Sequence, residues 1–447
     1  MKNYDYLIMG FGKSGQSVLK FIIKTGKSAI VYDENMDKIK QSAVFSGFNT
    51  QNNLKFIKKL QKVHIDSIKT IIISPSISIF NKNINYAKSV GKEIIGELEF
   101  GYLINKKPKY VAITGTNGKT TTTMLINQML QTKYKCGAYG NIGVPLTSAA
   151  TEHLNYIALE VSSFQLESIK KFKPNIFAIL NIDADHLDRH KTIENYIKMK
   201  YRIFENCTSS DIGIINADDN VFKSFPIKTL ARLLYFSKSK EVEGVYLKDG
   251  LVIANLNNKK QQIVKISDFN LPFNITDDIL AAILIAKLCK IPNNNIKNVL
   301  YNFKLAPYRA AEKIINGIKI INDSKSTNIH STINAIENQT NVILLLGGED
   351  KQLSFKPLFR AKNAGIKQVI CFGKTAHKIY QDAKKCKLSA IIKQKNCKNA
   401  VLCALNMAKP GDTILFSPAC SSFDEFTSYK ERGKFFDEVV NKFFTNC

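Results

Sequence analysis

Residues 110–122 read YVAITGTNGKTTT, and this stretch decides the fold of the segment around it. The apolar run from Tyr110 to Ile113 predicts a strand, and the run from Met124 to Leu130 predicts a helix. Two glycines and a lysine lie between them, as in loops whose backbone N–H groups face phosphates. An incidental Gly/Thr-rich loop would explain neither the strand nor the helix. The stretch therefore predicts a nucleoside triphosphate site.

Each residue type in this loop has a specific use. Gly115 and Gly118 let the backbone approach phosphate oxygens, while Lys119 can reach the β- and γ-phosphates and the Thr120 hydroxyl can bind Mg²⁺. The spacing differs from the usual G-x-x-x-x-G-K-[ST], because the first glycine lies only three residues before the second. The expected ATP-binding loop consists of Gly115, Thr116, Asn117, Gly118, Lys119, Thr120 and Thr121.

An N-terminal unit with the same alternation precedes this loop. A short apolar strand over 6–9 leads into Gly10, Gly12 and Gly15, which are spaced G-x-G-x-x-G. An amphipathic helix and a second strand ending at Asp33 follow, which is the order of a Rossmann-like unit. Taken alone, the glycine pattern fits a nucleotide site and also a tight turn that simply needs glycine.

The C-terminal third again alternates strands and helices, which indicates an α/β sheet with crossover connections. Its expected strands lie at 317–321, 342–346, 368–372 and 413–416. A length of 447 residues agrees with about three domains. We therefore expect an α/β protein with an N-terminal Rossmann-like unit (1–95), a central P-loop ATPase-type parallel sheet (96–303) and a C-terminal Rossmann-like domain (304–447).

The chain is strongly basic, with 64 Lys and Arg against 37 Asp and Glu, or a net charge of +27. Such an excess fits a polyanionic partner, such as nucleic acid or an acidic membrane, or lysines scattered over solvated faces. No run of five consecutive basic residues occurs, so we favour scattered lysines and expect no nucleic-acid partner. Because 45% of the residues are hydrophobic, a disordered polycation is excluded.

The cysteines and the apolar segments indicate in which cellular compartment the protein is expected. The nine cysteines are irregularly spaced and include no C-x-x-C pair, which favours reduced thiols in a cytosol. The N-terminus lacks the long apolar region of a signal peptide. The longest strongly apolar segment, 279–286, is too short to span a bilayer. We expect a cytoplasmic protein without membrane insertion.

Polar clusters follow several expected strands, at the edge where ligands of open α/β sheets bind. Glu160 follows the apolar run 157–159, and a carboxylate downstream of a phosphate loop suits Mg²⁺. Asp183, Asp185 and His186 follow another run and form a candidate metal or substrate site. Further polar runs lie at 322–328, 347–351 and 417–424.

These motifs, in this order, resemble those of the ATP-dependent Mur ligases, and the resemblance covers nearly the whole chain. Its motifs are TGTNGKT at 114–120, GNIG at 140–143, EVSSFQLE at 160–167, DHLDR at 185–189, NDSKSTN at 322–328, LLGG at 345–348 and SPACSSFD at 417–424. The last motif and the short N-terminal unit favour the D-glutamate-adding member. Another Mur ligase, or folylpolyglutamate synthase, which shares the ATPase core, is the alternative.

The resemblance implies that the chain joins D-glutamate to UDP-N-acetylmuramoyl-L-alanine in peptidoglycan precursor synthesis, with ATP cleaved to ADP and phosphate. The acceptor carboxylate would attack the γ-phosphate to give an acyl phosphate, from which the amine of D-glutamate would displace phosphate. Both steps move negative charge between oxygens, so positioned cations would carry most of the catalysis. The resemblance also implies two Mg²⁺ sites. We expect a monomer that acts on small molecules.

The resemblance also assigns the catalytic and metal-binding residues. The catalytic group would comprise Lys119, His186, Lys200 and Lys325, and the metal ligands would be Thr120, Glu160, His186 and Lys200. Lys200 falls where the family carries a carbamylated lysine, which supplies an anionic oxygen ligand. Without the resemblance, Lys200 would be interpreted as an ordinary exposed helix lysine.

The substrate contacts are carried over in the same way. The UDP-substrate site would contain Lys13, Ser14, Asp33, Ser76, Asn141 and His186. Outside the phosphate loop, ATP would contact Asn274, Arg309 and Asp323. D-glutamate would contact Lys325, Thr327, Lys351, Ser422, Phe423 and Tyr429.

Three positions depart from the family pattern. The stretch LPFNITDD at 271–278 replaces a Leu-Pro-Gly-like turn followed by His-Asn, and it is one residue shorter. In the Pro-His-Arg motif of the family, Tyr308 replaces the His, while the Arg is retained as Arg309. Ser76 stands where Gly is common. None of these changes removes a catalytic group, so we expect an active enzyme.

Overall fold

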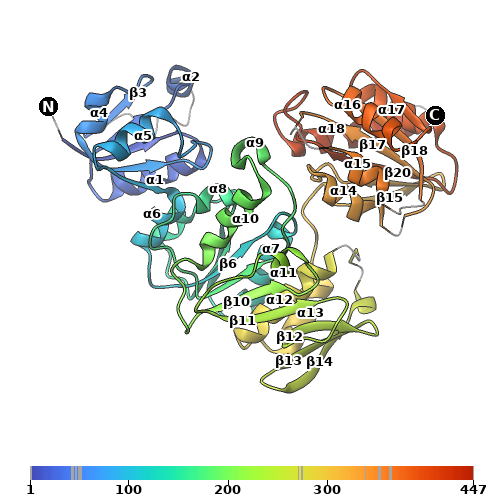
Figure 1. Ribbon diagram of the computed structural model, residues 1–447, viewed down its shortest axis with the longest axis horizontal. Coiled ribbons are helices and arrows are strands. Elements are labelled where there is room, and N and C mark those ends of the chain that lie inside the picture. The colour runs from blue at the N-terminus through green and yellow to red at the C-terminus, as the bar shows by residue number, and fades with distance from the viewer. Residues whose placement is uncertain are drawn as a thin grey trace. The chain divides into compact units, whose positions relative to one another are not determined.

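The computed structural model describes residues 3–41, 45, 48, 53–269, 271–272, 275–337, 339–350, 354–361 and 365–445. These residues form three sheets, seen as blue, green-to-yellow and orange-to-red groups in Figure 1. Their contacts divide the chain into two compact units. Unit 1 consists of Met1–Ile182, Glu194–Asn270 and Thr276–Asn302, and unit 2 consists of Asp183–Ile193, Leu271–Ile275 and Phe303–Cys447.

The N-terminal sheet of unit 1 is parallel, with the strand order β3-β2-β1-β4-β5. Its strands are β1 (Tyr4–Met9), β2 (Ala29–Tyr32), β3 (Leu54–Ile57), β4 (Ile68–Ile73) and β5 (Glu93–Gly96), with helices α1 (Lys13–Lys24), α2 (Met36–Lys40), α4 (Lys62–Asp66) and α5 (Lys82–Ser89). The strand order reverses between β1 and β4. Ligands of open parallel sheets bind at such a switch point, so the turns after β1 and β4 share a candidate binding edge.

The central sheet of unit 1 has the order β14-β13-β12-β11-β10-β9-β6-β8-β7. It is parallel from β7 to β12, whereas β13 and β14 join it antiparallel. The strands are β6 (Lys109–Thr114), β7 (Cys136–Gly140), β8 (Tyr156–Glu160), β9 (Ile176–Ile179), β10 (Ile212–Asn216), β11 (Arg232–Ser237), β12 (Gly244–Lys248), β13 (Leu251–Leu256) and β14 (Lys259–Lys265). Because β6 lies between β8 and β9 and runs parallel to both, the phosphate loop after β6 lies beside the polar residues that follow β8.

Helical segments connect and cover the central strands. They are α6 (Glu97–Ile104), α7 (Lys119–Gln131), η1 (Leu146–Thr151), α8 (Ser163–Leu166), α10 (Ile193–Tyr201), η2 (Arg202–Phe204), α11 (Val221–Ser224), η3 (Ile266–Asp268), α12 (Thr276–Leu288) and α13 (Asn293–Asn302). The longest apolar segment of the sequence lies on α12, which packs against α7 and is buried from Ile279 to Ala286. Among the described residues, no helix is long and apolar enough to cross a membrane.

The sheet of unit 2 has the order β15-β16-β20-β17-β18-β19, and only β15 is antiparallel to its neighbour. The strands are β15 (Ala311–Ile315), β16 (Ile318–Asn322), β17 (Val342–Gly347), β18 (Ile366–Phe372), β19 (Ile391–Lys393) and β20 (Thr413–Ala419). The helices are α9 (Leu187–His190), α14 (Ile329–Ile336), α15 (Lys356–Arg360), α16 (Ala376–Lys385), α17 (Cys397–Met407) and α18 (Tyr429–Thr445).

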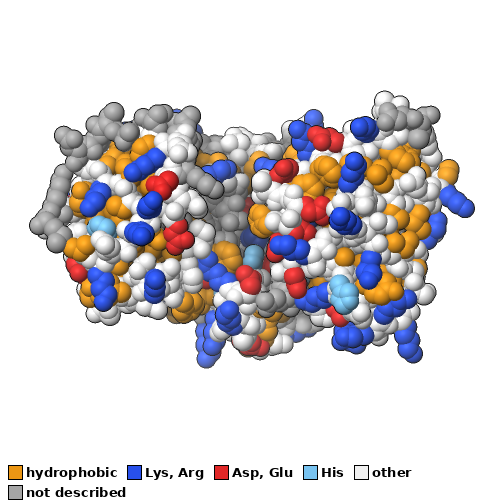
Figure 2. Space-filling view, turned by 90° about the horizontal axis from the view of Figure 1, so that it is seen from above, with side chains coloured by type: hydrophobic (Ala, Val, Ile, Leu, Met, Phe, Trp, Pro, Cys, Tyr) orange, Lys and Arg blue, Asp and Glu red, His pale blue; other side chains and the backbone are white. Residues whose placement is uncertain are grey.

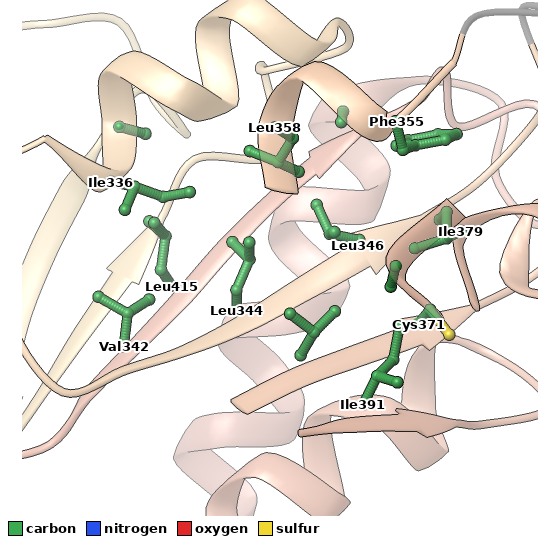
Figure 3. Close-up of a cluster of buried hydrophobic side chains, with 14 of the residues drawn as sticks. Ile336, Val342, Leu344, Leu346, Phe355, Leu358, Cys371, Ile379, Ile391 and Leu415 are labelled. Atoms are coloured by element: carbon green, nitrogen blue, oxygen red, sulfur yellow. The ribbon is translucent and has the colours of Figure 1, made fainter. Parts of the chain in front are cut away.

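The core of this sheet follows the strand period. Val342, Leu344 and Leu346 of β17 are fully buried and point to one face, where Ile336 of α14 and Leu358 of α15 pack on them (Figure 3). The intervening Ile343 and Leu345 belong to the cluster on the opposite face. Because both faces are covered, β17 is a continuous apolar run, as expected for a central parallel strand.

The predicted α/β fold class is confirmed, and the expected strands of all three sheets are present. The strands β10 to β14 were not predicted, and the boundaries 95/96 and 303/304 stay predictions. The eight cysteines among the described residues are free thiols. On the face shown in Figure 2, lysine and arginine side chains are dispersed over the surface rather than gathered in one stripe.

Candidate active site

The phosphate loop joins the carboxyl end of β6 to the amino end of α7, which begins at Lys119 itself. Gly118 caps the helix with φ at +81°, a left-handed conformation that favours glycine. Asn181, just beyond β9, fixes the loop, because its carbonyl accepts from the Thr116 N–H (2.9 Å) and its Oδ1 accepts from the Asn117 N–H (2.8 Å). The amino end of α7 therefore offers backbone N–H groups to an anion.

Asp278 of α12 lies directly behind this loop. A Cβ added to Gly118 would come within 2.0 Å of its Oδ1, so a side chain there would force Asp278 to shift and would also strain the left-handed backbone. The same oxygen accepts a hydrogen bond from the Thr122 hydroxyl (3.1 Å). Neither Asn181 nor Asp278 was singled out as a site residue from the sequence, because their partners lie 64 and 156 residues away.

Two lysines reach the phosphate loop from different helices. The Lys119 ammonium donates to the carbonyls of Gly115 and Thr116, both at 2.7 Å. Lys200 of α10 donates to the same Gly115 carbonyl at 2.7 Å, and its Nζ lies 4.6 Å from the ring centre of Tyr196. Lys200 is 1% exposed, so the interpretation as a surface lysine is wrong: α10 directs this side chain inward against the loop.

Glu160, the last residue of β8, has one oxygen bound and one without a hydrogen bond. It is 2% exposed, and its Oε1 accepts from the Asn141 amide at 2.7 Å. Its Oε2 is buried and has no hydrogen-bond partner. Leaving a buried carboxylate oxygen unpartnered is costly, and such an atom is well placed to bind a cation.

Glu160 and Thr120 have the chemistry of Mg²⁺ ligands. Magnesium prefers oxygen ligands, which Glu160 and the Thr120 hydroxyl at the start of α7 both supply. Within the described part of the chain, no three His, Cys, Asp or Glu side chains lie together as a metal-binding cluster. His186 belongs to unit 2, with φ at +54° and its Nε2 3.7 Å from Asp185 Oδ2. A metal site shared by Glu160, His186 and Lys200 stays a prediction.

The glycine turn after β1 is held by its neighbours at the switch point. The Asp33 carboxylate accepts from the N–H of Phe11 (2.8 Å) and of Asn35 (2.9 Å). A Cβ on Gly15 would come within 2.0 Å of the Gly10 carbonyl, so the turn requires glycine there. Asp33 thus braces the turn, and its contact with UDP stays a prediction.

Lys13 and Ser14 open α1, and Lys13 lies beside the GNIG loop. The Lys13 Nζ is 3.8 Å from the position that a Cβ on Gly143 would take. The hydroxyls of Ser17 on α1 and Ser148 on η1 hydrogen-bond at 2.9 Å. The structure therefore brings Lys13 close to the loop that carries Asn141. Ser76 is exposed on the turn after β4, at the same switch point.

In unit 2, several of the expected D-glutamate residues lie in the loops that follow the adjacent strands β16 and β20. The Lys325 ammonium lies 4.3 Å from the ring centre of Tyr429. Ser422 is buried and Phe423 is 70% exposed in the loop after β20, while Thr327 is half-buried before α14. Two predicted site residues, Lys351 and Asn274, lie outside the described residues.

Asp323 is a buried carboxylate whose oxygens are used within unit 2. They accept from the hydroxyls of Ser326 (2.5 Å) and Ser417 (3.0 Å) and from the Ala310 N–H (3.2 Å). Desolvation by burial raises the pKa of Asp323 to about 6. Arg309 lies beside it and partly opposes this shift. Contacts of Arg309 and Asp323 with ATP stay predictions.

Arg432 of α18 joins the strand-end loops of unit 2, although it was not singled out from the sequence. It is fully buried and donates to the carbonyls of Ser324 (2.9 Å) and Cys420 (3.0 Å), with longer bonds to those of Gly347 and Ser421. Burial lowers the pKa of Arg432 to about 10, so the side chain stays charged at neutral pH. In the sequence it stands among charged residues of a helix, a pattern that normally indicates an exposed face.

Family models match almost all of this architecture. A Mur ligase MurD-like N-terminal domain matches residues 4–96, a Mur ligase middle domain matches 113–284 and a Mur ligase glutamate ligase domain matches 309–420. The chain belongs to the Mur ligase family. It is 37% identical to the UDP-N-acetylmuramoylalanine–D-glutamate ligase of Clostridioides difficile over 99% of both chains, and 38% identical to that of Thermoanaerobacter sp. over 98% of both.

Solved structures share the fold of this Mur ligase at low sequence identity. A pseudomurein peptide ligase type C from Methanothermus fervidus has a TM-score of 0.62 at 17% identity, covering 99% of this chain and 100% of that one. The MurF ligase of Thermotoga maritima in complex with ADP has a TM-score of 0.61 at 14% identity, covering 99% and 96%. These likenesses support the three-sheet architecture.

Proposed function

We propose that this Mur ligase joins D-glutamate to UDP-N-acetylmuramoyl-L-alanine and cleaves ATP to ADP and phosphate. The observation that carries the proposal is the 37% identity, over 99% of the chain, to a ligase named for that reaction. The site supports it, because the phosphate loop, the buried Lys200 and the partly unpartnered Glu160 lie in one part of unit 1.

In the first step, an oxygen of the acceptor carboxylate attacks the γ-phosphorus, and the bond from that phosphorus to the ADP oxygen breaks. Lys119 would turn from the loop carbonyls to the β- and γ-phosphates, and the N–H groups of α7 would bind phosphate oxygens. Mg²⁺ held by Thr120 and Glu160 would neutralise phosphate charge. We further propose a second Mg²⁺ site with His186 and a carbamylated Lys200.

In the second step, the amine nitrogen of D-glutamate attacks the acyl carbon, the carbon–oxygen bond to phosphate breaks, and the amine loses a proton. Lys325 would bind a carboxylate of D-glutamate, next to Tyr429 and Ser422. Thr327, Lys351 and Phe423 would complete this pocket. Arg309, Asp323 and Asn274 would contribute on the ATP side.

The N-terminal sheet would hold the uridine nucleotide of the acceptor at its switch point. Lys13 and Ser14 open α1 there, with Asp33 and Ser76 beside them and Asn141 on the adjoining GNIG loop. Every substrate is then a small anion, which requires only a few of the 64 basic residues. We propose that the enzyme acts in the cytoplasm as a monomer.

A phosphate-release assay with one component omitted at a time tests this function. We expect release only when ATP, UDP-N-acetylmuramoyl-L-alanine and D-glutamate are all present with Mg²⁺. Release that does not depend on the acceptor, or that requires L-glutamate in place of the D-isomer, would overturn the proposal. A preparation of Lys119→Ala controls for contaminating ATPases.

A further inference from the structure

Residues 166–172, here called the bridge segment, run from the end of α8 toward β9. From Glu167 onward they form neither helix nor strand. Their backbone groups are instead bound by side chains of two other elements, α6 and the η2 region. Because the segment follows Glu160 and α8 directly, its position bears on the phosphate site.

Arg202, at the start of η2, binds the first half of the bridge segment. Its Nη1 donates to the carbonyls of Leu166 (2.8 Å) and Glu167 (2.7 Å), and its Nη2 donates to that of Ile169 (2.8 Å). Its remaining N–H groups pair with the carboxylate of Glu205 at 2.7 and 3.4 Å. All five N–H groups of this guanidinium therefore have an acceptor.

Glu99 and Asn206 bind the second half. The Glu99 carboxylate is 1% exposed and accepts from the backbone N–H groups of Lys170 (2.9 Å), Lys171 (2.8 Å) and Phe172 (2.9 Å). The Asn206 amide donates to the carbonyls of Lys170 (2.9 Å) and Phe172 (3.1 Å). Side chains therefore replace the hydrogen bonds that regular secondary structure would supply.

Two of the residues that bind the bridge segment are close in sequence to residues of the N-terminal sheet's core and of the phosphate site. Glu99 stands on α6, beside Phe100, whose ring packs in the core of the N-terminal sheet at 5.6 Å from that of Tyr6. Arg202 follows Lys200 by two residues, and Lys200 contacts the phosphate loop at Gly115. A continuous set of contacts thus runs from the N-terminal sheet, through the bridge segment, to the phosphate loop.

We infer that Glu99, Arg202 and Asn206 are positioning residues that fix the distance between the UDP site and the phosphate loop. The inference rests on the proposed function, in which one acceptor is held by its UDP at the N-terminal sheet and reacts through its carboxylate at the γ-phosphate. Reacting atoms must approach to about 3–3.5 Å, and a misplacement of about 1 Å can cost about 100-fold in rate. Loosening the bridge segment therefore slows the chemistry without weakening the binding of either substrate.

Steady-state kinetics of Glu99→Gln and Asn206→Ala test this inference. Gln keeps the size of Glu99 but presents N–H groups to backbone N–H groups, so we expect kcat to fall at least about tenfold. We expect Asn206→Ala, a milder change at a partly exposed side chain, to lower kcat about threefold. The KM values for ATP and for the UDP-substrate should stay within about twofold, because the binding groups are untouched.

Arg202 provides a rescue experiment. Arg202→Met removes every hydrogen bond that Arg202 donates to the bridge segment. Arg202→Lys keeps the charge and three N–H donors. We expect kcat of the Lys variant to lie between those of the wild type and the Met variant. Equal kcat values for the two variants would contradict a role that depends on these hydrogen bonds.

Asp5→Asn is the matched control for lost stability. The Asp5 carboxylate accepts from the N–H (2.8 Å) and hydroxyl (2.7 Å) of Ser28 near the amino end of β1, at the opposite edge from the glycine turn. We expect this variant to have a lower Tm and an unchanged kcat. Wild-type kcat in folded Glu99→Gln and Asn206→Ala, or an equal loss of kcat in Asp5→Asn, would overturn the inference.

A failure of the proposed function would be measured in the wild-type enzyme, separately from the variants. In that case the wild type would release no phosphate from ATP in the presence of UDP-N-acetylmuramoyl-L-alanine and D-glutamate. The same kcat comparison is then made with whichever acceptor and amino acid the wild type does join. Unchanged kcat values in the bridge variants would still overturn the positioning role.

Discussion

The phosphate loop of unit 1 and the strand-end loops of unit 2 are two proposed anion sites built in different ways. The phosphate loop uses the backbone of seven consecutive residues, with Gly118 at the start of a helix. In the loops of unit 2, the buried Arg432 ties Ser324 to Cys420, residues that are far apart in the chain. A site made from local backbone can be recognised in a sequence, whereas a site assembled by one buried side chain cannot.

The two units also differ in how they use a buried carboxylate. Glu160 in unit 1 has an oxygen without a hydrogen-bond partner, while the oxygens of Asp323 in unit 2 accept from two hydroxyls and one N–H. The first arrangement is suited to an added cation, and the second stabilises its own domain. Burial alone therefore does not distinguish a ligand-binding carboxylate from a structural one.

The largest effect is expected for Lys119→Ala. Removing the cation that the loop presents to the phosphates should lower turnover at least about 1,000-fold. Stability should change much less, because the hydrogen bonds of the ammonium to the carbonyls of Gly115 and Thr116 are local ones within the loop. Phosphate release and the Tm measure the two quantities. Substantial activity in this variant would contradict the assignment of the phosphate loop.

Glu160→Gln tests the unpartnered oxygen. Turnover should fall about 100-fold and the Mg²⁺ concentration for half-maximal activity should rise, because an anionic ligand is lost. Stability should stay equal or increase, since a buried charged oxygen without a partner is removed. Denaturant unfolding together with a Mg²⁺ titration measures both. A variant that loses stability but keeps its Mg²⁺ dependence would show that Glu160 is structural.

Arg432→Met tests the assembled site. Three strand-end loops lose their common donor, so we expect unit 2 to be destabilised by about 3 kcal/mol. The KM for D-glutamate should rise at least about tenfold while the KM for ATP changes little. A rise in the KM for ATP alone would place the amino-acid site elsewhere.

Asp323→Asn tests the carboxylate of unit 2 through pH. Burial raises the pKa of Asp323 from its ordinary value of 3.8 to about 6. The folded state therefore binds the proton more tightly, and this group makes stability fall as pH rises from about 4 to about 6. The variant should lack that part of the pH dependence in urea unfolding between pH 4 and pH 7. Identical profiles would contradict the raised pKa.

The smallest structural effect is expected for Phe423→Ala. Phe423 is 70% exposed, so its loss should change the free energy of unfolding by less than about 0.5 kcal/mol. If Phe423 covers D-glutamate, the KM for D-glutamate should rise about threefold, as expected for losing apolar contact with a ligand. Kinetics at varied D-glutamate measures this change, and an unchanged KM would remove Phe423 from the pocket.

Much of the fold could be predicted from the sequence, because buried parallel strands are continuous apolar runs and the glycines mark their turns. The helix after the phosphate loop begins at Lys119, five residues earlier than expected. The strands β10 to β14 were not predicted. Some of them, such as β14, have many exposed polar residues and so give a weak apolar signal.

The site was predictable only where chemistry is local or where the resemblance supplied it. Lys200 was expected from the resemblance alone, as a carbamylated metal ligand. The structure buries it against Gly115 of the phosphate loop, and its role as a ligand stays a prediction. Asn181, Asp278 and Arg432 act on partners that are distant in sequence, so no spacing pattern could reveal them.

Phosphate release measured against a panel of amino acids, with ATP and UDP-N-acetylmuramoyl-L-alanine fixed, tests the central claim most directly. The panel includes D-glutamate, L-glutamate, L-lysine and a diamino acid. We expect rapid release with D-glutamate and background rates with the others. Turnover with the diamino acid or with L-glutamate at the expense of D-glutamate would contradict it.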